Sequence, residues 1–228
     1  MIKLENVEVV GWEPTIRGMR NPKNSWHLSD SHMCVGEDIC SMVENGDAPA
    51  ECSGGCTEFC MGERDHDLAM RLVKGGPVHA KYRRMIVVYL DITAPLYWWK
   101  EFDTYKVGTV ANSCSTMHKI HAKEFTLDDF SYDQLDYPST CLLKDIIRVL
   151  NRHRESFIAT NCKQFWWNMI QLLPSSYNQK RTVMLNYEVL VGMYQHRKNH
   201  KLDEWKEFCA WIESLPYSEI ITGRKEEE

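Results

Sequence analysis

The chain has 228 residues, of which 43% are hydrophobic and 26% are charged, proportions that exclude a disordered or collagen-like chain. Its 27 Lys+Arg and 32 Asp+Glu give a formal net charge of −5, which argues against a general nucleic-acid binder with a basic surface. No run approaches the roughly 18 apolar residues of a membrane span, and no apolar run follows the first charges as in a signal peptide. The sequence therefore predicts a cytoplasmic protein that binds neither membranes nor nucleic acid.

The first third of the chain predicts few regular elements. A short strand is expected at Val7–Val10, and the polar stretch Ser25–His32 has no period and is expected to be a loop. Residues 34–65 are rich in cysteine, lack apolar periodicity and predict an inserted loop. Apolar residues among charges predict a helix over Asp65–Val73, which Gly75-Gly76-Pro77 would end.

The rest of the chain has clearer patterns, which predict strands and helices in turn. Met85–Ile92 is β-branched and nearly continuous, as in a buried strand, and Pro95 suits the first turn of a following helix. A loop or short strand is expected at Val107–Ser115. Helical spacing of apolar residues predicts four further helices: Leu142–Leu150, Gln164–Leu173, Met184–Tyr194 and Leu202–Leu215. Together these elements predict one α+β domain over residues 1–228, with residues 34–65 as an insertion.

Five of the nine cysteines crowd into residues 34–60: Cys34, Cys40, Cys52, Cys56 and Cys60. The last three supply the close pairs that a structural zinc site needs, and His66 could be a further ligand. A loop with incidental thiols is the alternative, while a reducing compartment disfavours a disulfide. Cys52, Cys56 and Cys60 are therefore the candidate zinc ligands.

Three polar segments have competing readings. Arg152-His153-Arg154 suggests phosphate binding, but it follows an amphipathic run, where a solvated basic helix end is common. His118 and His121 are expected to be surface residues. The donor-rich residues 175–182 are expected to connect two helices, either as a phosphate or ribose site or as a plain turn.

Three segments, in order, resemble the flavin-dependent thymidylate synthase family. Ala94-Pro95 takes the place of the family's strand end, Lys100-Glu101 that of its Arg-Gln, and Thr104-Tyr105-Lys106 that of its Arg-His-Arg. A one-residue insertion then restores the family's serine as Ser115 and its asparagine as Asn112. His79 fits the first histidine of an earlier motif, while Asn186 and Arg197 fall on later family positions. The resemblance covers residues 75–215, which would be the family-like core.

The resemblance implies a homotetramer that reductively methylates dUMP with methylenetetrahydrofolate and NADPH through bound FAD. The cofactor would carry the difficult chemistry, and the protein would orient and charge the site. Carried over by position, the resemblance assigns the flavin to His79, Thr104, Tyr105, Lys106, Asn112 and Asn186. It places Lys100 and Glu101 near the nucleotide phosphate, and it assigns nucleotide contact and catalysis to Ser115 and Arg197.

The departures from the family pattern leave alternatives open. Lysine at positions 100 and 106 keeps the charge of the family's arginine but loses its bidentate fork. Glu101 and Glu188 place carboxylates where the family has Gln and Arg, and an unpaired carboxylate beside a phosphate would cost several kcal/mol in a dry site. Either a cation or a neighbouring lysine compensates, or the ligand is not dUMP. The alternatives are therefore a nucleotide-binding protein of the same fold with altered or lost catalysis, or a metal-stabilised interaction protein.

Overall fold

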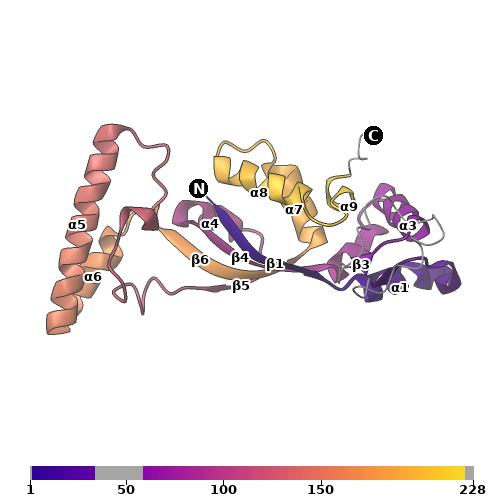
Figure 1. Cartoon of the computed structure of the whole chain (residues 1–228), viewed down its shortest axis with the longest axis horizontal. Coiled ribbons are helices and arrows are strands. Elements are labelled where there is room, and N and C mark those ends of the chain that lie inside the picture. Colours follow the sequence, from indigo (N-terminus) through magenta and orange to yellow (C-terminus); the bar gives the residue numbers. More distant parts are fainter. Residues whose placement is uncertain (1, 34–58, 224–228) are drawn as a thin grey trace, which may run out of the picture. The chain divides into compact units, whose positions relative to one another are not determined.

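The structure is a computed structural model that describes residues 2–33 and 59–223 (Figure 1). It confirms the α+β class, with a four-stranded sheet of order β1-β4-β6-β5 and a two-stranded sheet of β2 and β3. The strands are β1 (Lys3–Val10), β2 (His32–Met33), β3 (Phe59–Cys60), β4 (Val87–Pro95), β5 (Val110–Ser113) and β6 (Asn178–Asn186). The strand pairs β2–β3 and β5–β6 are antiparallel.

Helices follow or separate the strands along the chain. The α-helices are α1 (Trp12–Arg20), α3 (Glu63–Lys74), α4 (Leu96–Phe102), α5 (Tyr137–Thr160), α6 (Lys163–Leu172), α7 (Tyr187–Arg197), α8 (Asp203–Glu213) and α9 (Glu219–Thr222). Short 3-10 helices are η1 (Asn21–Lys23), η2 (Trp26–Leu28), η3 (Ala80–Met85) and η4 (Leu127–Asp129). Within the described ranges, no helix is both long and apolar enough to cross a membrane.

The contacts divide the chain into two compact units. The first unit comprises Met1–Glu8, Val88–Leu185 and Val189–Leu215. The second unit comprises Val9–Val87, Asn186–Glu188 and Pro216–Glu228. Neither unit is one continuous segment, since the chain leaves each of them and returns.

An aromatic cluster of α4 and α8 forms one core of the first unit. Its members are at most 1% exposed: Trp98, Trp99, Phe102, Trp205 and Phe208. The ring centroids of Trp98 and Trp205 lie 4.7 Å apart, and Trp99 Nε1 donates to the carbonyl of Gln179 on β6 at 3.0 Å. Such rings bury large apolar areas, so α4 and α8 are fixed to each other and to the sheet.

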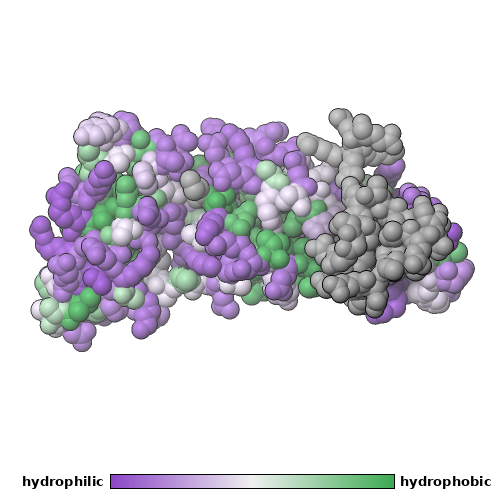
Figure 2. Space-filling model, viewed as in Figure 1, coloured by the Kyte–Doolittle hydropathy of each residue, from purple (hydrophilic) through white to green (hydrophobic). Residues whose placement is uncertain are grey.

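A second core of the first unit lies under α5 and α6. Its buried members are Ile120, Phe125, Phe130, Leu143, Ile147, Leu150 and Met169. The Asp136 side chain caps α5 by accepting from the Ser139 amide, and α5 ends at Asn161, whose φ of 51° is left-handed. Other apolar side chains of α5, including Leu142 and Ile158, are exposed, and Figure 2 shows hydrophobic patches over this helix pair.

The second unit packs around α1. Trp12, Ile16 and Met19 recur at helical spacing and are buried, with the Trp12 ring stacked on Phe59 at 5.5 Å. Gly11 precedes α1 with φ +95°, and a Cβ there would lie 2.3 Å from the Met85 carbonyl oxygen. Only glycine therefore allows α1 to start so close to the end of η3.

The helices expected near Asp65–Val73, after Pro95 and near Leu202–Leu215 are confirmed as α3, α4 and α8. The helix expected from Met184 is wrong at its start, because β6 continues to Asn186 and includes most of the connector expected over residues 175–182. The loop expected over residues 34–65 is wrong at its end, where β3 and the start of α3 lie. The remainder of that loop, residues 34–58, lies outside the described residues.

Candidate functional site

Glu101, Tyr105, Arg197, His200 and Trp205 form a polar cluster in the first unit, called here the Glu101 cluster. Arg197 Nη1 donates to Glu101 Oε2 at 2.6 Å, and Arg197 Nε donates to the Tyr105 hydroxyl at 3.0 Å. The same oxygen of Glu101 accepts from Trp205 Nε1 at 2.9 Å and lies 3.3 Å from His200 Nε2. The structure thus brings together Glu101, Tyr105 and Arg197, three residues that the family resemblance assigns to the nucleotide or the flavin.

Local backbone geometry sets up this cluster. Glu101 lies in the last turn of α4, where the Thr104 hydroxyl donates to its carbonyl at 2.7 Å and closes a turn that leads to Tyr105. Arg197 ends α7, and its carbonyl accepts from the His200 amide at 2.9 Å. His200 Nδ1 in turn accepts from the Leu202 amide at 3.2 Å, which orients the ring with Nε2 on the side of Glu101.

The Arg197 guanidinium is held by charge and by aromatic faces. Its central carbon lies 4.8 Å from the Trp205 ring centroid and 5.6 Å from that of Tyr105. The Arg197 side chain is 18% exposed and that of Glu101 34%, so the ion pair is partly shielded from water. Arg197, rather than exposed Lys100, therefore compensates the charge of Glu101.

Glu188 is the second carboxylate that departs from the family pattern, and in the second unit it too lies beside an arginine. Its Oε2 lies 3.5 Å from Nε of Arg83, whose side chain is 6% exposed. Each of the two acidic departures thus lies beside an arginine of its own unit.

The other site residues predicted in the first unit do not join the Glu101 cluster. Thr104 and Lys106 are exposed in the turn after α4, and exposed Asn112 lies opposite Thr182 in the β5–β6 ladder. The Ser115 hydroxyl accepts from the amides of Met117 and His118 at 3.2 and 2.8 Å, which stabilises the turn after β5. The roles assigned to these residues stay predictions.

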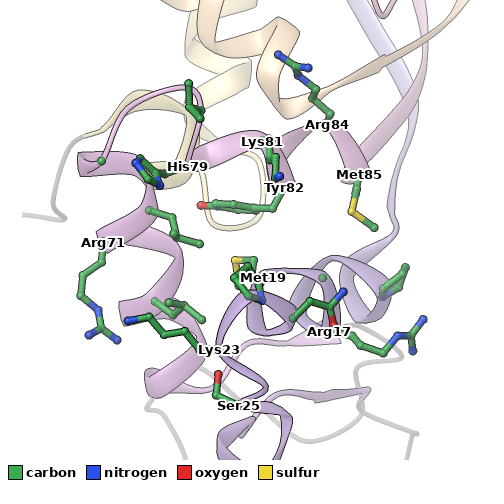
Figure 3. Close-up of a pocket in the computed structure, with 18 residues that line it drawn as sticks. Arg17, Met19, Lys23, Ser25, Arg71, His79, Lys81, Tyr82, Arg84 and Met85 are labelled. Carbon is green, nitrogen blue, oxygen red and sulfur yellow. The ribbon is translucent and has the colours of Figure 1, made fainter.

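A cavity of about 1070 Å³ lies within the second unit and includes His79 (Figure 3). Its wall comes from α1, the chain after it, α3 and η3. None of its described lining residues is Asp or Glu. Five basic side chains line it: Arg17, Lys23, Arg71, Lys81 and Arg84. None of these five forms an ion pair with a carboxylate in the described part of the chain.

The base of this cavity is apolar. Met19 and Tyr82 are buried beneath it, and Leu68 and Leu72 add aliphatic surface from α3. In Figure 3, Arg71 and Arg84 extend away from the centre of the view, from α3 and η3 respectively. An apolar base with a cationic rim suits an organic anion, whose flat apolar part is buried while its charged groups meet lysine and arginine.

The remaining predicted ligands lie in the second unit or outside the described residues. Asn186 ends β6, and Cys60 lies in β3. Cys52 and Cys56 lie outside the described residues, so the zinc site stays a prediction. Among the residues that the structure describes, no group of three His, Cys, Asp or Glu is arranged to hold a metal ion.

Sequence reasoning missed the cationic rim and two members of the Glu101 cluster. His79-Ala-Lys81-Tyr-Arg-Arg84 is a visibly basic segment, but Arg17 and Lys23 join it only through the fold. His200 and Trp205 carry no local signal that points to Glu101. The helix end expected at Arg152-His153-Arg154 is wrong, because α5 continues to Thr160, and Arg154 Nε donates to the His121 carbonyl at 3.0 Å.

Comparison with known proteins places this arrangement in a known fold. A crystal structure of the flavin-dependent thymidylate synthase ThyX from Helicobacter pylori, complexed with FAD and dUMP, matches 96% of this chain and 99% of its own, with a TM-score of 0.63 and 14% identity. A second ThyX structure from that organism, also with FAD and dUMP, covers 98% of each chain at the same TM-score and identity. No protein-family model and no curated protein matches the chain. Over nearly its whole length, the chain has the fold of the flavin-dependent thymidylate synthases.

Proposed function

We propose that the protein is a flavin-dependent enzyme of the thymidylate synthase type, which binds FAD and a uridine nucleotide or a close relative. The observation that carries the proposal is the fold shared, over nearly the full chain, with structures that contain FAD and dUMP. The finer steps, reductive methylation of dUMP with methylenetetrahydrofolate and NADPH in a cytoplasmic homotetramer, are part of the proposal.

The cationic cavity of the second unit supports FAD as the cofactor, and of the residues that the resemblance assigns to the flavin it includes His79 but not Thr104, Tyr105, Lys106, Asn112 or Asn186. FAD joins a flat, largely apolar ring system to two phosphates, which matches an apolar base edged by five basic side chains. When bound, FAD would supply the hydride and one-carbon chemistry. In this proposal the chain's own Lys81 and Arg84 neutralise the phosphates, and Tyr82 with Met19 shields the ring from water.

The absorbance spectrum of the purified protein tests this proposal. We expect flavin bands that bleach anaerobically with NADPH and change on addition of dUMP. The native mass measured on the same sample should correspond to four chains. A colourless protein that cannot be reconstituted with FAD would contradict the proposal.

A variant that removes two positive charges from the cavity tests whether FAD binds there. Lys81→Ala with Arg84→Ala removes two exposed cations of the cavity, and we expect FAD affinity to fall at least about tenfold, since each charge-assisted contact contributes about 1.5–3 kcal/mol. The matched control is Lys144→Ala with Arg152→Ala, which removes two exposed cations of α5. Equal losses in both double variants would rule out a specific role for the cavity.

The Glu101–Arg197 ion pair favours a second candidate, a nucleotide-binding protein of the same fold whose catalysis is altered or lost. The guanidinium at the family's nucleotide-binding position is already paired with a carboxylate of the same chain. Expression in a thymidine-requiring strain separates the candidates. Growth without thymidine supports the synthase, whereas nucleotide binding without growth supports the second candidate.

A further inference from the structure

The cavity of the second unit carries more positive charge than the phosphates of FAD neutralise. In the proposed function, Lys81 and Arg84 bind these two phosphates. Arg17, Lys23 and Arg71 line the same cavity and have no assigned anion. None of these three forms an ion pair with a carboxylate in residues 2–33 and 59–223. The cavity therefore suits a second anionic group, which would relieve the repulsion among its cations.

The three unassigned cations come from different parts of the cavity wall. Arg17 lies on α1 and Lys23 in η1, whereas Arg71 lies on α3. Arg71 Nε donates to the Asp67 carbonyl at 3.3 Å, a contact that orients the guanidinium without neutralising it. All three residues are exposed, and in Figure 3 Lys23 and Arg71 lie across the view from Arg84. They can therefore meet an anion that extends away from the phosphate-binding side.

The proposed reaction brings such an anion to this cavity. A one-carbon donor must lie against the flavin for the transfer, so methylenetetrahydrofolate would enter the cavity whose apolar base receives the flavin ring. The cavity volume of about 1070 Å³ exceeds the range of about 300–1,000 Å³ that is usual for a single small-molecule site. The flat pteridine of the folate would lie over the apolar part, and its glutamate end would extend along the cationic rim.

The glutamate end of a folate matches the unassigned charge. A folate monoglutamate carries two carboxylates. Each further glutamate uses one carboxylate in its peptide bond and brings two, so it adds one negative charge. Carboxylates bind arginine through paired hydrogen bonds and lysine as a point charge. The two arginines and one lysine can therefore bind more carboxylates than a monoglutamate supplies.

We propose that Arg17, Lys23 and Arg71 are specificity-determining residues, which bind the glutamate carboxylates of the folate and make the enzyme prefer folates with several glutamates to the monoglutamate. The folate itself rests on the proposed function, whereas the preference rests on the three cations of the cavity. These residues bind the tail of the substrate and take no part in the transfer.

Anaerobic calorimetric titration of the FAD-loaded protein with tetrahydrofolate monoglutamate and triglutamate tests the preference. We expect the wild-type protein to bind the triglutamate at least about fivefold more tightly, because two more carboxylates meet cations and each exposed pair adds a modest contribution. Arg17→Ala with Lys23→Ala should reduce this ratio to less than about twofold and change FAD affinity less than about twofold. Both residues are exposed, so the double variant should keep the fold.

Lys144→Ala with Arg152→Ala is the matched control, because it removes two exposed cations of α5 and should leave the ratio unchanged. Equal binding of the two folates by the wild-type protein would overturn the proposal, as would failure to bind either. A ratio that persists in Arg17→Ala with Lys23→Ala would overturn it too. An equal loss of FAD and triglutamate affinity in that variant would assign these cations to the cofactor instead.

The flavin spectrum of the same samples separates this inference from the proposed function. A wild-type protein that cannot be reconstituted with FAD contradicts the proposed enzyme, and titration of that protein with the two folates still decides the role of the three cations. A flavin-containing protein that binds both folates equally contradicts the inference alone.

Discussion

At the scale of single residues, Asp65 is a heavily hydrogen-bonded carboxylate of the second unit. It is fully buried beside Arg20, whose Nε lies 2.5 Å from Asp65 Oδ1, and its Oδ2 accepts from the hydroxyls of Ser29 and Ser31 at 2.7 Å. Burial alone would raise the pKa of Asp65, but hydrogen bonds from Ser31, Ser29 and Arg20 outweigh it and hold the pKa below its usual value. The carboxylate therefore stays charged at neutral pH.

Asp65→Asn should destabilise the protein by about 3–5 kcal/mol, because it leaves the buried Arg20 guanidinium without a counter-charge. Urea unfolding measures the loss. The control Asp67→Asn changes an exposed carboxylate of the same helix and should cost less than about 0.5 kcal/mol. Because the pKa of Asp65 is lowered, the difference between wild type and Asp65→Asn should shrink as the pH falls below about 4. A difference that grows on acidification would refute this account.

Asp91 offers a second pH-dependent test, in the sheet of the first unit. The Thr182 hydroxyl donates to Asp91 Oδ1 at 2.6 Å, and Asn6 and Lys180 bind the other oxygen, which together lower its pKa to about 2. A lowered pKa means that its stabilising effect is complete above about pH 4 and is lost as the pH falls towards 2. Carbon-detected NMR titration should place the Asp91 midpoint near 2 and show a higher midpoint in Thr182→Val. An unchanged midpoint in that variant would exclude Thr182 as the main cause.

At the scale of elements, α4 and α8 depend on their shared aromatic cluster. Phe208→Ala empties a fully buried site whose ring contacts Trp98 and Trp205 at 5.7 Å each. We expect a loss of about 3–5 kcal/mol in the free energy of unfolding, from lost burial and the cavity left behind. Tyr137→Ala, at an aromatic side chain that is 83% exposed, should change it by less than about 0.5 kcal/mol. Equal effects of the two substitutions would argue against this core.

The elements that sequence alone could predict are those with local signals. Apolar spacing with a nearby proline or glycine locates α3 and α4, because these signals act within the segment itself. β6 was missed because its polar residues are satisfied by distant partners: Gln179 donates to the Cys114 carbonyl at 2.8 Å, and Arg181 lies over the Trp99 ring at 4.1 Å. No single segment contains that information.

The candidate site divides in the same way. The family resemblance selected Glu101, Tyr105 and Arg197 as site residues, and the structure brings these three together. Their contact joins residues 96 apart in the sequence, so the ion pair that neutralises Arg197 could not be read from spacing. His200 and Trp205 enter only because α8 packs on α4.

At the scale of the whole molecule, the local charge of the cavity is opposite in sign to the net charge of the chain. The chain carries a net charge of −5, yet the cavity of the second unit is lined by cations with no acidic residue among its described lining residues. A local field of this kind attracts anionic ligands despite the overall charge.

The affinity for FAD should therefore fall with salt. Raising the ionic strength from about 0.1 to 1 M shortens the screening length from about 10 to 3 Å, and we expect binding to weaken at least about tenfold. Fluorescence titration measures the change. Lys81→Ala with Arg84→Ala should show a smaller salt dependence than the wild-type protein. Identical dependence in both proteins would mean that the cavity cations do not hold the cofactor.

The division of the second unit among distant segments has a consequence for protein synthesis. Its core includes Ile220 and Ile221, and the Met61 amide donates to the Tyr217 hydroxyl at 2.7 Å. When α1 and α3 leave the ribosome, these late partners have not yet been made. Trp12 and its neighbours therefore stay exposed on the emerging segment until residues 217–221 have been synthesised. We expect chaperones that bind nascent chains to bind this segment.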